Sequence, residues 1–184
     1  MLNTFVIYVE DKPGVLARVA ILFRRRAFNI ETLTVGRTEH PGISRMTIVL
    51  DTDERGARRI EANLYKLVNV LWIQNVTNSC VTSDLALLKV AVTAERRGEL
   101  FEIAKKYDAH VVEEGADALI LEISGDGEKI GGFIAGLRSF HVLEMVRTGS
   151  IAMTRCGQGF PAKNFIPSLK QQAENGPLGV SRPI

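Results

Sequence analysis

The residues best suited to bind a small ligand form a turn at positions 10–14, of sequence EDKPG, between an expected strand and an expected helix. Pro13 fixes φ for a first helical turn and lacks only an N–H that the helix could not use there. Gly14 adds no Cβ, so the backbone amides of Gly14, Val15 and Leu16 are expected to face outward. These amides carry the positive end of the helix dipole, which suits a small anion such as a carboxylate.

Two polar side chains are candidates to receive an ammonium group. Asp11 lies in the same turn, and Asn29 precedes Ile30 at the start of the next expected strand. Together with the outward amides, they are typical of a pocket for a free amino acid. The alternative is an ordinary strand-to-helix turn in which Asp11 or Lys12 lies near the helix cap.

The elements that position these residues follow a pattern that occurs twice along the chain. In the first half, Phe5, Ile7 and Val9 alternate as in a strand, and apolar residues of the segment 15–23 recur at helical spacing. The turn at 40–42, of sequence HPG, separates the next two strands. The further elements expected in this half are strands at 30–37, 46–50 and 70–76 and a helix at 57–67.

The same βαββαβ order recurs from Asp84 onward, and Asp126 can cap the last helix. The expected elements are strands at 85–89, 111–112, 119–123 and 142–146 and helices at 100–107 and 130–137. The sequence therefore predicts an α+β fold of two ferredoxin-like sandwiches, each with a four-stranded antiparallel sheet and two helices on one face.

This repeat divides the chain into domains at residues 1–78 and 84–156, joined by a linker at 79–83. Glycine and proline interrupt the sequence after Cys156, so residues 157–184 are predicted to be a flexible tail. An alternative for the tail is a short peptide that becomes ordered on a partner.

Helices on one face leave the other face of each sheet to be covered. In the first expected strand, Val6 and Tyr8 point toward that other face. We therefore expect a homodimer, with sheets paired edge to edge or face to face.

The composition excludes several classes of protein. The chain has 184 residues, 46% of them hydrophobic, and a net charge of +2. That charge is too small to indicate nucleic acid, and the run at 24–26, of sequence RRR, is interpreted as the solvated end of a helix. No apolar stretch approaches the ~20 residues of a membrane span, so we expect a cytoplasmic protein that does not contact membranes. Cys80 and Cys156 lie far apart without a CxxC motif and are expected to be reduced.

The chain offers no set of residues suited to catalysis. His40, His110 and His141 belong to separate elements, and none is spaced with carboxylates or cysteines as a metal site requires. No P-loop, GxSxG or HExxH pattern occurs. A chain with a ligand-binding turn and no catalytic residues is predicted to be a regulator rather than an enzyme.

Three segments carry a more specific pattern: residues 10–19, residues 28–35 and residues 44–49, of sequences EDKPGVLARV, FNIETLTV and SRMTIV. They resemble the small regulatory subunit of acetohydroxyacid synthase, also called acetolactate synthase. The junction at 65–70 and the closing motifs at 147–149 and 155–157 are similar to the same family, so the resemblance covers residues 1 to about 157. The first half resembles an ACT domain.

The resemblance implies a non-catalytic subunit that binds and activates the large catalytic subunit and makes it sensitive to feedback by branched-chain amino acids, usually valine. Thiamine diphosphate, Mg²⁺ and FAD are then expected only in the catalytic partner, and no cofactor in this chain. In the family, the effector lies between two ACT domains. The corresponding residues of this chain are Asp11, Gly14, Val15, Leu16, Asn29 and Ile30.

This chain departs from the family at one of these positions. Asp11 stands where the family commonly has asparagine, and it should help to hold an ammonium group but repel a carboxylate on the same side. A stand-alone pair of ACT domains that senses an amino acid for a different enzyme or regulator is the alternative function. No ligand is expected in the second domain, because the segment 93–97, of sequence TAERR, lacks Pro-Gly at its helix entrance.

Overall fold

The computed structural model describes residues 1–157. The predicted flexible tail at 157–184 lies outside these residues, apart from Gly157. Cys80 and Cys156 are both free thiols. None of the helices within residues 1–157 is long and apolar enough to cross a bilayer.

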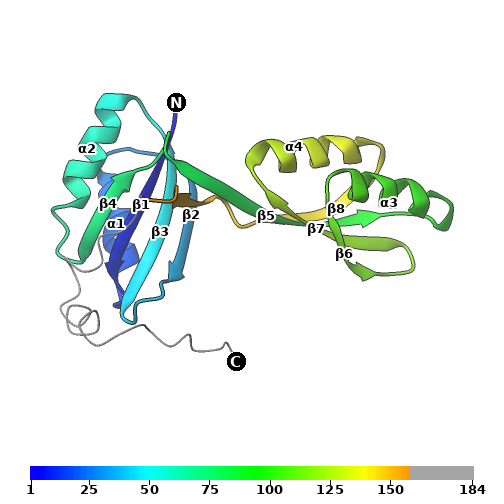
Figure 1. Ribbon diagram of the computed structural model, residues 1–184, viewed down its shortest axis with the longest axis horizontal. Coiled ribbons are helices and arrows are strands. Elements are labelled where there is room, and N and C mark those ends of the chain that lie inside the picture. Colours follow the sequence, from blue (N-terminus) through cyan, green and yellow to red (C-terminus); the bar gives the residue numbers. More distant parts are fainter. Residues whose placement is uncertain (158–184) are drawn as a thin grey trace. The chain divides into compact units, whose positions relative to one another are not determined.

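The first half of the chain forms one antiparallel sheet with two helices on one face (Figure 1). The strand order is β2-β3-β1-β4, so β2 and β4 are the edge strands. The elements are β1 (Leu2–Glu10), α1 (Val15–Arg25), β2 (Ile30–Arg37), β3 (Ile43–Asp51), α2 (Glu54–Leu64) and β4 (Val70–Asn75).

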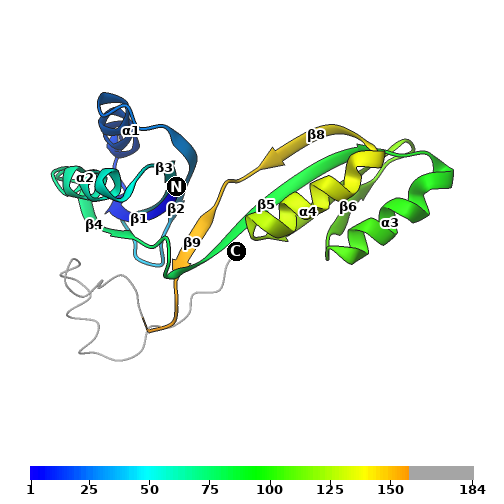
Figure 2. The ribbon, with the colours of Figure 1, turned by 90° about the horizontal axis from the view of Figure 1, so that it is seen from above.

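The second half repeats this arrangement with the strand order β6-β7-β5-β8. Figure 2, seen from above, shows the two helices of this half in front of its strands. The corresponding strands therefore occupy corresponding places in the two sheets, which confirms the predicted fold of two ferredoxin-like sandwiches. The elements are β5 (Cys80–Ala91), the 3₁₀ turn η1 (Ala94–Arg96), α3 (Arg97–Lys106), β6 (His110–Glu114), β7 (Ala118–Gly125), α4 (Gly127–Gly136), the 3₁₀ turn η2 (Leu137–Ser139), β8 (His141–Arg147) and β9 (Ile151–Thr154).

Each sandwich has its own apolar core between sheet and helices. In the first, alternate residues of β1, including Phe5 and Ile7, pack against Val19 and Phe23 of α1. In the second, Leu88 of β5 and Phe133 of α4 belong to one buried cluster. Full burial of a side chain of this size stabilises the fold by about 1.5–3 kcal/mol. The predicted alternation in strands and periodicity in helices thus select the buried face of each element.

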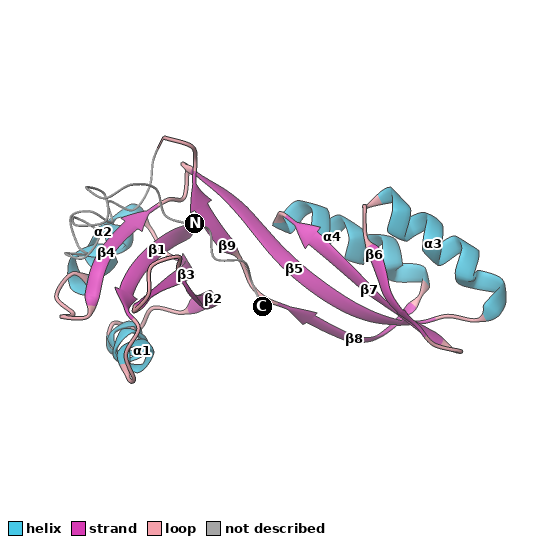
Figure 3. Cartoon of the chain, turned by 60° about the horizontal axis from the view of Figure 1, so that its bottom comes forward, coloured by secondary structure: helices cyan, strands magenta, loops and turns pink. Residues whose placement is uncertain are grey.

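One strand differs from the sequence expectation. The segment 79–83, expected as a linker, contains the first residues of β5, where Cys80–Ser83 pair with Ile151–Thr154 of β9. The rest of β5 pairs with β7 and β8, as Figure 3 shows. Residues 80–83 and 151–154 are each too short to show a long alternating pattern. Each is stabilised as a strand by pairing with the other, which lies far away in sequence, so the local pattern does not reveal this pair.

The ribbon of β9 and the start of β5 covers part of the open face of the first sheet. Val6 is only 1% exposed and clusters with Val76 and Ala152. Thr34 of β2 donates a hydrogen bond to the Ser150 carbonyl at 2.7 Å, and Arg45 of β3 donates to that of Ala152. The cover that we expected from a second chain is therefore supplied, at Val6, by the same chain.

Gly149 allows this close approach. Its φ is +78°, and a Cβ there would lie 3.0 Å from the Cβ of Thr32 on β2. A larger residue would face both backbone strain and a steric contact with the sheet.

The predicted cap of the last helix is confirmed and gives a stability test. The Asp126 carboxylate accepts a hydrogen bond from the Lys129 amide at 2.8 Å. We expect Asp126→Ala to lower the free energy of unfolding by about 1 kcal/mol, because the amide at the helix start loses its acceptor. Urea unfolding followed by circular dichroism measures the change. Glu128→Ala, in the same exposed first turn, is the control, and equal effects of the two substitutions would contradict the capping role.

Candidate functional site

Gly14 has the geometry expected of a ligand-binding turn. It precedes α1 with φ +82°, in the left-handed region, and no side chain of residues 1–157 caps this helix. The position of a Cβ on Gly14 has no atom of these residues within 4 Å. Glycine adopts this conformation freely, whereas most other residues would be strained by about 1–2 kcal/mol. The start of α1 is therefore open to close approach by a ligand.

The backbone amides of the turn are only partly occupied. The Val15 amide donates to the Lys12 carbonyl at a long distance of 3.4 Å, and the Asp11 amide donates to that of Gly42 at 2.8 Å. Within residues 1–157, the amides of Gly14 and Leu16 donate to no protein acceptor. The helix start can therefore offer a ligand carboxylate three donors. Two are the free amides of Gly14 and Leu16, and the third is the Val15 amide, which is only weakly bonded to Lys12.

The charge of Asp11 is partly balanced by a neighbour that the sequence analysis did not identify. The Arg37 guanidinium at the end of β2 lies 3.6 Å from the Asp11 carboxylate. Both groups are exposed, so the pair contributes little to stability. It does place a cation beside the turn, where the cation reduces the repulsion between Asp11 and a ligand carboxylate.

A second set of polar contacts holds the turn from the other side. The Asn69 amide group donates to the Glu10 carboxylate at 2.5 Å and accepts a hydrogen bond from Arg18 of α1. The Lys12 ammonium lies 3.1 Å from the same carboxylate. The hydrogen bond from Asn69, followed by that from Lys12, lowers the pKa of Glu10 below its ordinary value.

Asn29 and Ile30 lie at the other end of the sandwich from this turn. Ile30 and Asn3 both pair with Leu50 of β3, whereas Asp11 follows Glu10, which pairs with Ile43. Seven residue steps of β3 separate these two levels, roughly 23 Å at about 3.3 Å per residue. One chain therefore brings Asp11, Gly14, Val15 and Leu16 together but does not bring Asn29 or Ile30 to them. This separation follows from the direction of β2, which starts at the end of the sheet opposite the turn.

Asn29 has a partner of its own at that end. Its side-chain amide donates to the Glu31 carboxylate at 2.8 Å. Both residues are exposed and lie at the start of β2, an edge strand. The two halves of the predicted site are thus both open to solvent within a single chain.

The contact between Asn69 and Glu10 predicts a pH-dependent effect. Because the pKa of Glu10 is lowered in the folded chain, its contribution to stability is present above the ordinary carboxyl pKa and is lost as the pH falls through the lowered value. Asn69→Ala should raise the pKa of Glu10, since it removes the larger cause of the shift. An NMR titration of the Glu10 carboxyl carbon measures this. Asn78→Ala, at an exposed asparagine, should leave the value unchanged, and an unchanged pKa in both variants would refute the assignment.

Comparison with protein families gives two matches that together span both sandwiches. Residues 5–72 match the "AHAS small subunit-like ACT domain", and residues 83–156 match "Small subunit of acetolactate synthase".

Individual relatives and a solved structure agree with these matches. A probable acetolactate synthase small subunit of Archaeoglobus fulgidus is 43% identical over 155 residues, which cover 84% of this chain and 98% of the relative. An acetolactate synthase small subunit of Mycolicibacterium smegmatis is 38% identical over 161 residues, covering 87% and 95%. The crystal structure of the Thermotoga maritima small subunit superposes with a TM-score of 0.80 at 34% identity, covering 86% of this chain and 99% of that one. This chain therefore belongs to the family of acetolactate synthase small subunits.

Proposed function

We propose that this chain is the regulatory subunit of an acetolactate synthase, without catalytic activity of its own. It binds the large catalytic subunit, raises its activity and confers feedback inhibition by a branched-chain amino acid, usually valine, in the biosynthesis of valine, leucine and isoleucine. Thiamine diphosphate, Mg²⁺ and FAD belong to the catalytic partner in this proposal. Membership of the family over both domains supports the partner, and the open helix start at Gly14 supports the effector.

The effector site is completed by a second copy of the chain. β2 is an edge strand within the described part of the chain, so one of its sides can pair with another strand. When two copies of β2 pair antiparallel about a two-fold axis between Leu33 and Thr34, Ile30 of one copy lies opposite Arg37 of the other. Arg37 is beside Asp11, so Asn29 and Ile30 of one chain approach the turn at Gly14 of the second.

The surface around the β2 edge suits such pairing. Leu16 at the start of α1 is 43% exposed, and Val35 on β2 is 44% exposed. Burial of these apolar side chains between two copies would stabilise the pair. We therefore propose that the predicted homodimer forms at the β2 edge, because the open sheet face at Val6 is covered by β9.

Coupling between effector and activity follows from a site shared by two chains. A ligand that contacts both copies changes how the two α1 helices pack, and a catalytic subunit that prefers one arrangement loses activation when the other is populated. Such coupling is reciprocal, so the effector should bind the free chain and the complex with different affinities. One buried CH₂ changes affinity only about fourfold, so valine, leucine and isoleucine are all candidates.

A reconstitution assay tests the proposed function. Acetolactate formation from pyruvate by the catalytic subunit of the same organism should rise when this chain is added, and valine should reverse the rise. Activation without reversal by any branched-chain amino acid would refute the effector. An unchanged rate would refute the partner and favour the stand-alone amino-acid sensor.

A mixed dimer tests whether the effector site is shared. Gly14→Asp places a carboxylate where the ligand carboxylate binds, and Asn29→His removes the amide from the other half, so each variant alone should lose valine binding and feedback. In a dimer of one chain of each variant, one of the two shared sites keeps both native residues.

Calorimetric titration of the doubly tagged mixed dimer should therefore show half the wild-type number of valine sites. A site within one chain would leave none. Gly157→Asp is the matched control, because Gly157 has a similar φ of +85° and open space at its Cβ position. It should bind valine as the wild type does.

A further inference from the structure

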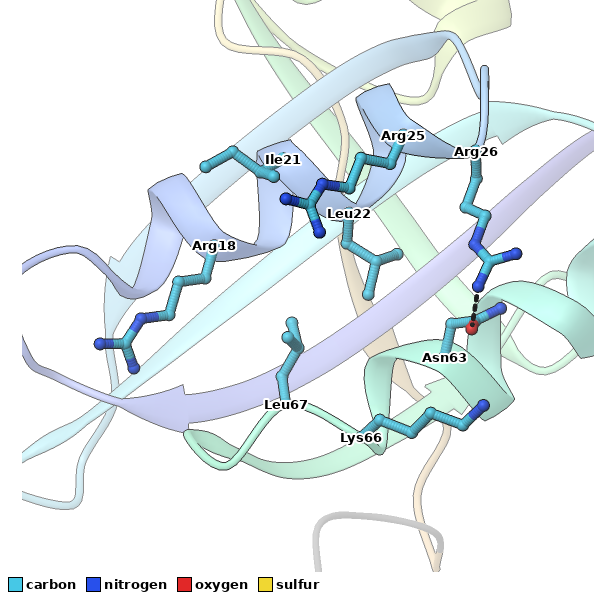
Figure 4. A pocket seen from close by; sticks show the side chains of 8 residues that line it. All are labelled: Arg18, Ile21, Leu22, Arg25, Arg26, Asn63, Lys66 and Leu67. Carbon is cyan, nitrogen blue, oxygen red and sulfur yellow. Dashed lines mark hydrogen bonds between the residues drawn. The ribbon is translucent and has the colours of Figure 1, made fainter.

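A hollow with an apolar floor and a basic rim lies between the two helices of the first sandwich (Figure 4). Its volume is about 340 Å³. Its apolar lining, called the floor below, consists of Ile21 and Leu22 of α1 and Leu67, just after α2. Arg18, Arg25 and Arg26 from α1 and its end, with Lys66 from the other side, form the rim. The hollow lies on the helix layer and contains none of the predicted effector residues.

Two of the three floor residues pack against the core of the first sandwich. Leu22 and Leu67 pack against the first core while remaining partly exposed, and Ile21 is 41% exposed. Positions 18, 21, 22 and 25 lie on one side of a helix, because residues three, four and seven apart share a face. The helix therefore presents aliphatic and cationic side chains together on the side toward α2.

The cations of the rim lack acidic partners. The Arg26 guanidinium donates to the neutral side chain of Asn63 at 3.1 Å, and Arg18 donates to that of Asn69. Within residues 1–157, Arg25 and Lys66 form no ion pair. Among the described residues, no carboxylate lines the hollow. The positive potential at this surface is therefore not neutralised by the described part of the chain.

The helix layer of the first sandwich as a whole also carries an excess of positive charge. Segments 15–26 and 54–66 contain eight of the 23 lysines and arginines but only two of the 21 acidic residues. Their net charge is +6, on a chain whose net charge is +2. The cations are therefore concentrated over this layer rather than spread over the molecule, as in a surface that attracts an acidic partner.

We propose that this hollow docks an acidic segment of the catalytic subunit, which inserts an apolar side chain onto Ile21, Leu22 and Leu67 and places carboxylates against the basic rim. The proposal rests on the proposed function. An aliphatic floor suits an apolar anchor with a polar surround, the usual anatomy of a protein interface. Nucleic acid is the less suitable occupant, because the lining as far as the structure describes it offers no aromatic side chain on which a base can stack.

Charge reversal at the rim tests the proposal with the full chain and the intact catalytic subunit. The readout is the concentration of this chain that gives half-maximal activation of acetolactate formation. Arg25→Glu combined with Lys66→Glu should raise that concentration about tenfold or more. Lys105→Glu is the matched control, because Lys105 is a cation in the last turn of α3, the corresponding helix of the second sandwich. It should leave the concentration unchanged.

Two further measurements separate the apolar and electrostatic parts. Ile21→Ser, at an exposed position, should raise the half-maximal concentration about fourfold without changing the melting temperature. For the wild type, that concentration should increase with salt, and the double variant should lose most of this dependence. At saturating concentration the double variant should keep its inhibition by valine, because the effector turn is unchanged.

The outcomes distinguish the two proposals. If the wild type activates and the double variant activates at the same concentration, the docking surface is refuted while the proposed function stands. If the wild type does not activate, both fail. If a short single-stranded RNA binds the wild type but not the double variant, and activation is equal in both, the hollow is a nucleic-acid site instead.

Discussion

The antiparallel pairing of β3 with both β1 and β2 is the constraint on which the candidate site depends. Because both strands oppose β3, they run parallel to each other, and α1 must carry the chain back along the sheet between them. The open turn at Gly14 and the start of β2 therefore lie at opposite ends of one sandwich. In the proposed function, a ligand that contacts both ends binds between two chains, so effector binding depends on how those chains pack.

The two sides of α1 then have different proposed roles. One side, near Leu16, faces the edge at which a second copy is proposed to pair. The other side bears Arg18 and Arg25 and lines the hollow next to α2. A rigid helix between the two surfaces would let a change in packing at one reach the other. In these proposals, feedback needs no contact between effector and catalytic subunit.

The sheet face at Val6 is covered by a β-ribbon of the same chain, where a second chain was expected. The first residues of β5 and the short strand β9, which are distant in sequence, pair with each other and lie over an apolar patch that the helices leave open. Hydrogen bonds from Thr34 to the Ser150 carbonyl and from Arg45 to the Ala152 carbonyl join this ribbon to the first sheet. Within residues 1–157, the sheet face at Val6 is thus covered, whereas the β2 edge pairs with no further strand.

The sequence by itself determined the features that depend on near neighbours: the order of the helices and of the strands up to β8, the cap at Asp126, and the open turn at Gly14. Each depends on hydrophobic periodicity or on backbone preferences within a few residues. The tertiary structure decided the features that depend on distant pairing. The separation of Asn29 from Gly14 follows from the direction of β2, the cover over Val6 from the pairing of β5 with β9, and the basic hollow from the packing of α1 beside α2. No local pattern encodes which side of a helix or which end of a strand a distant segment will meet.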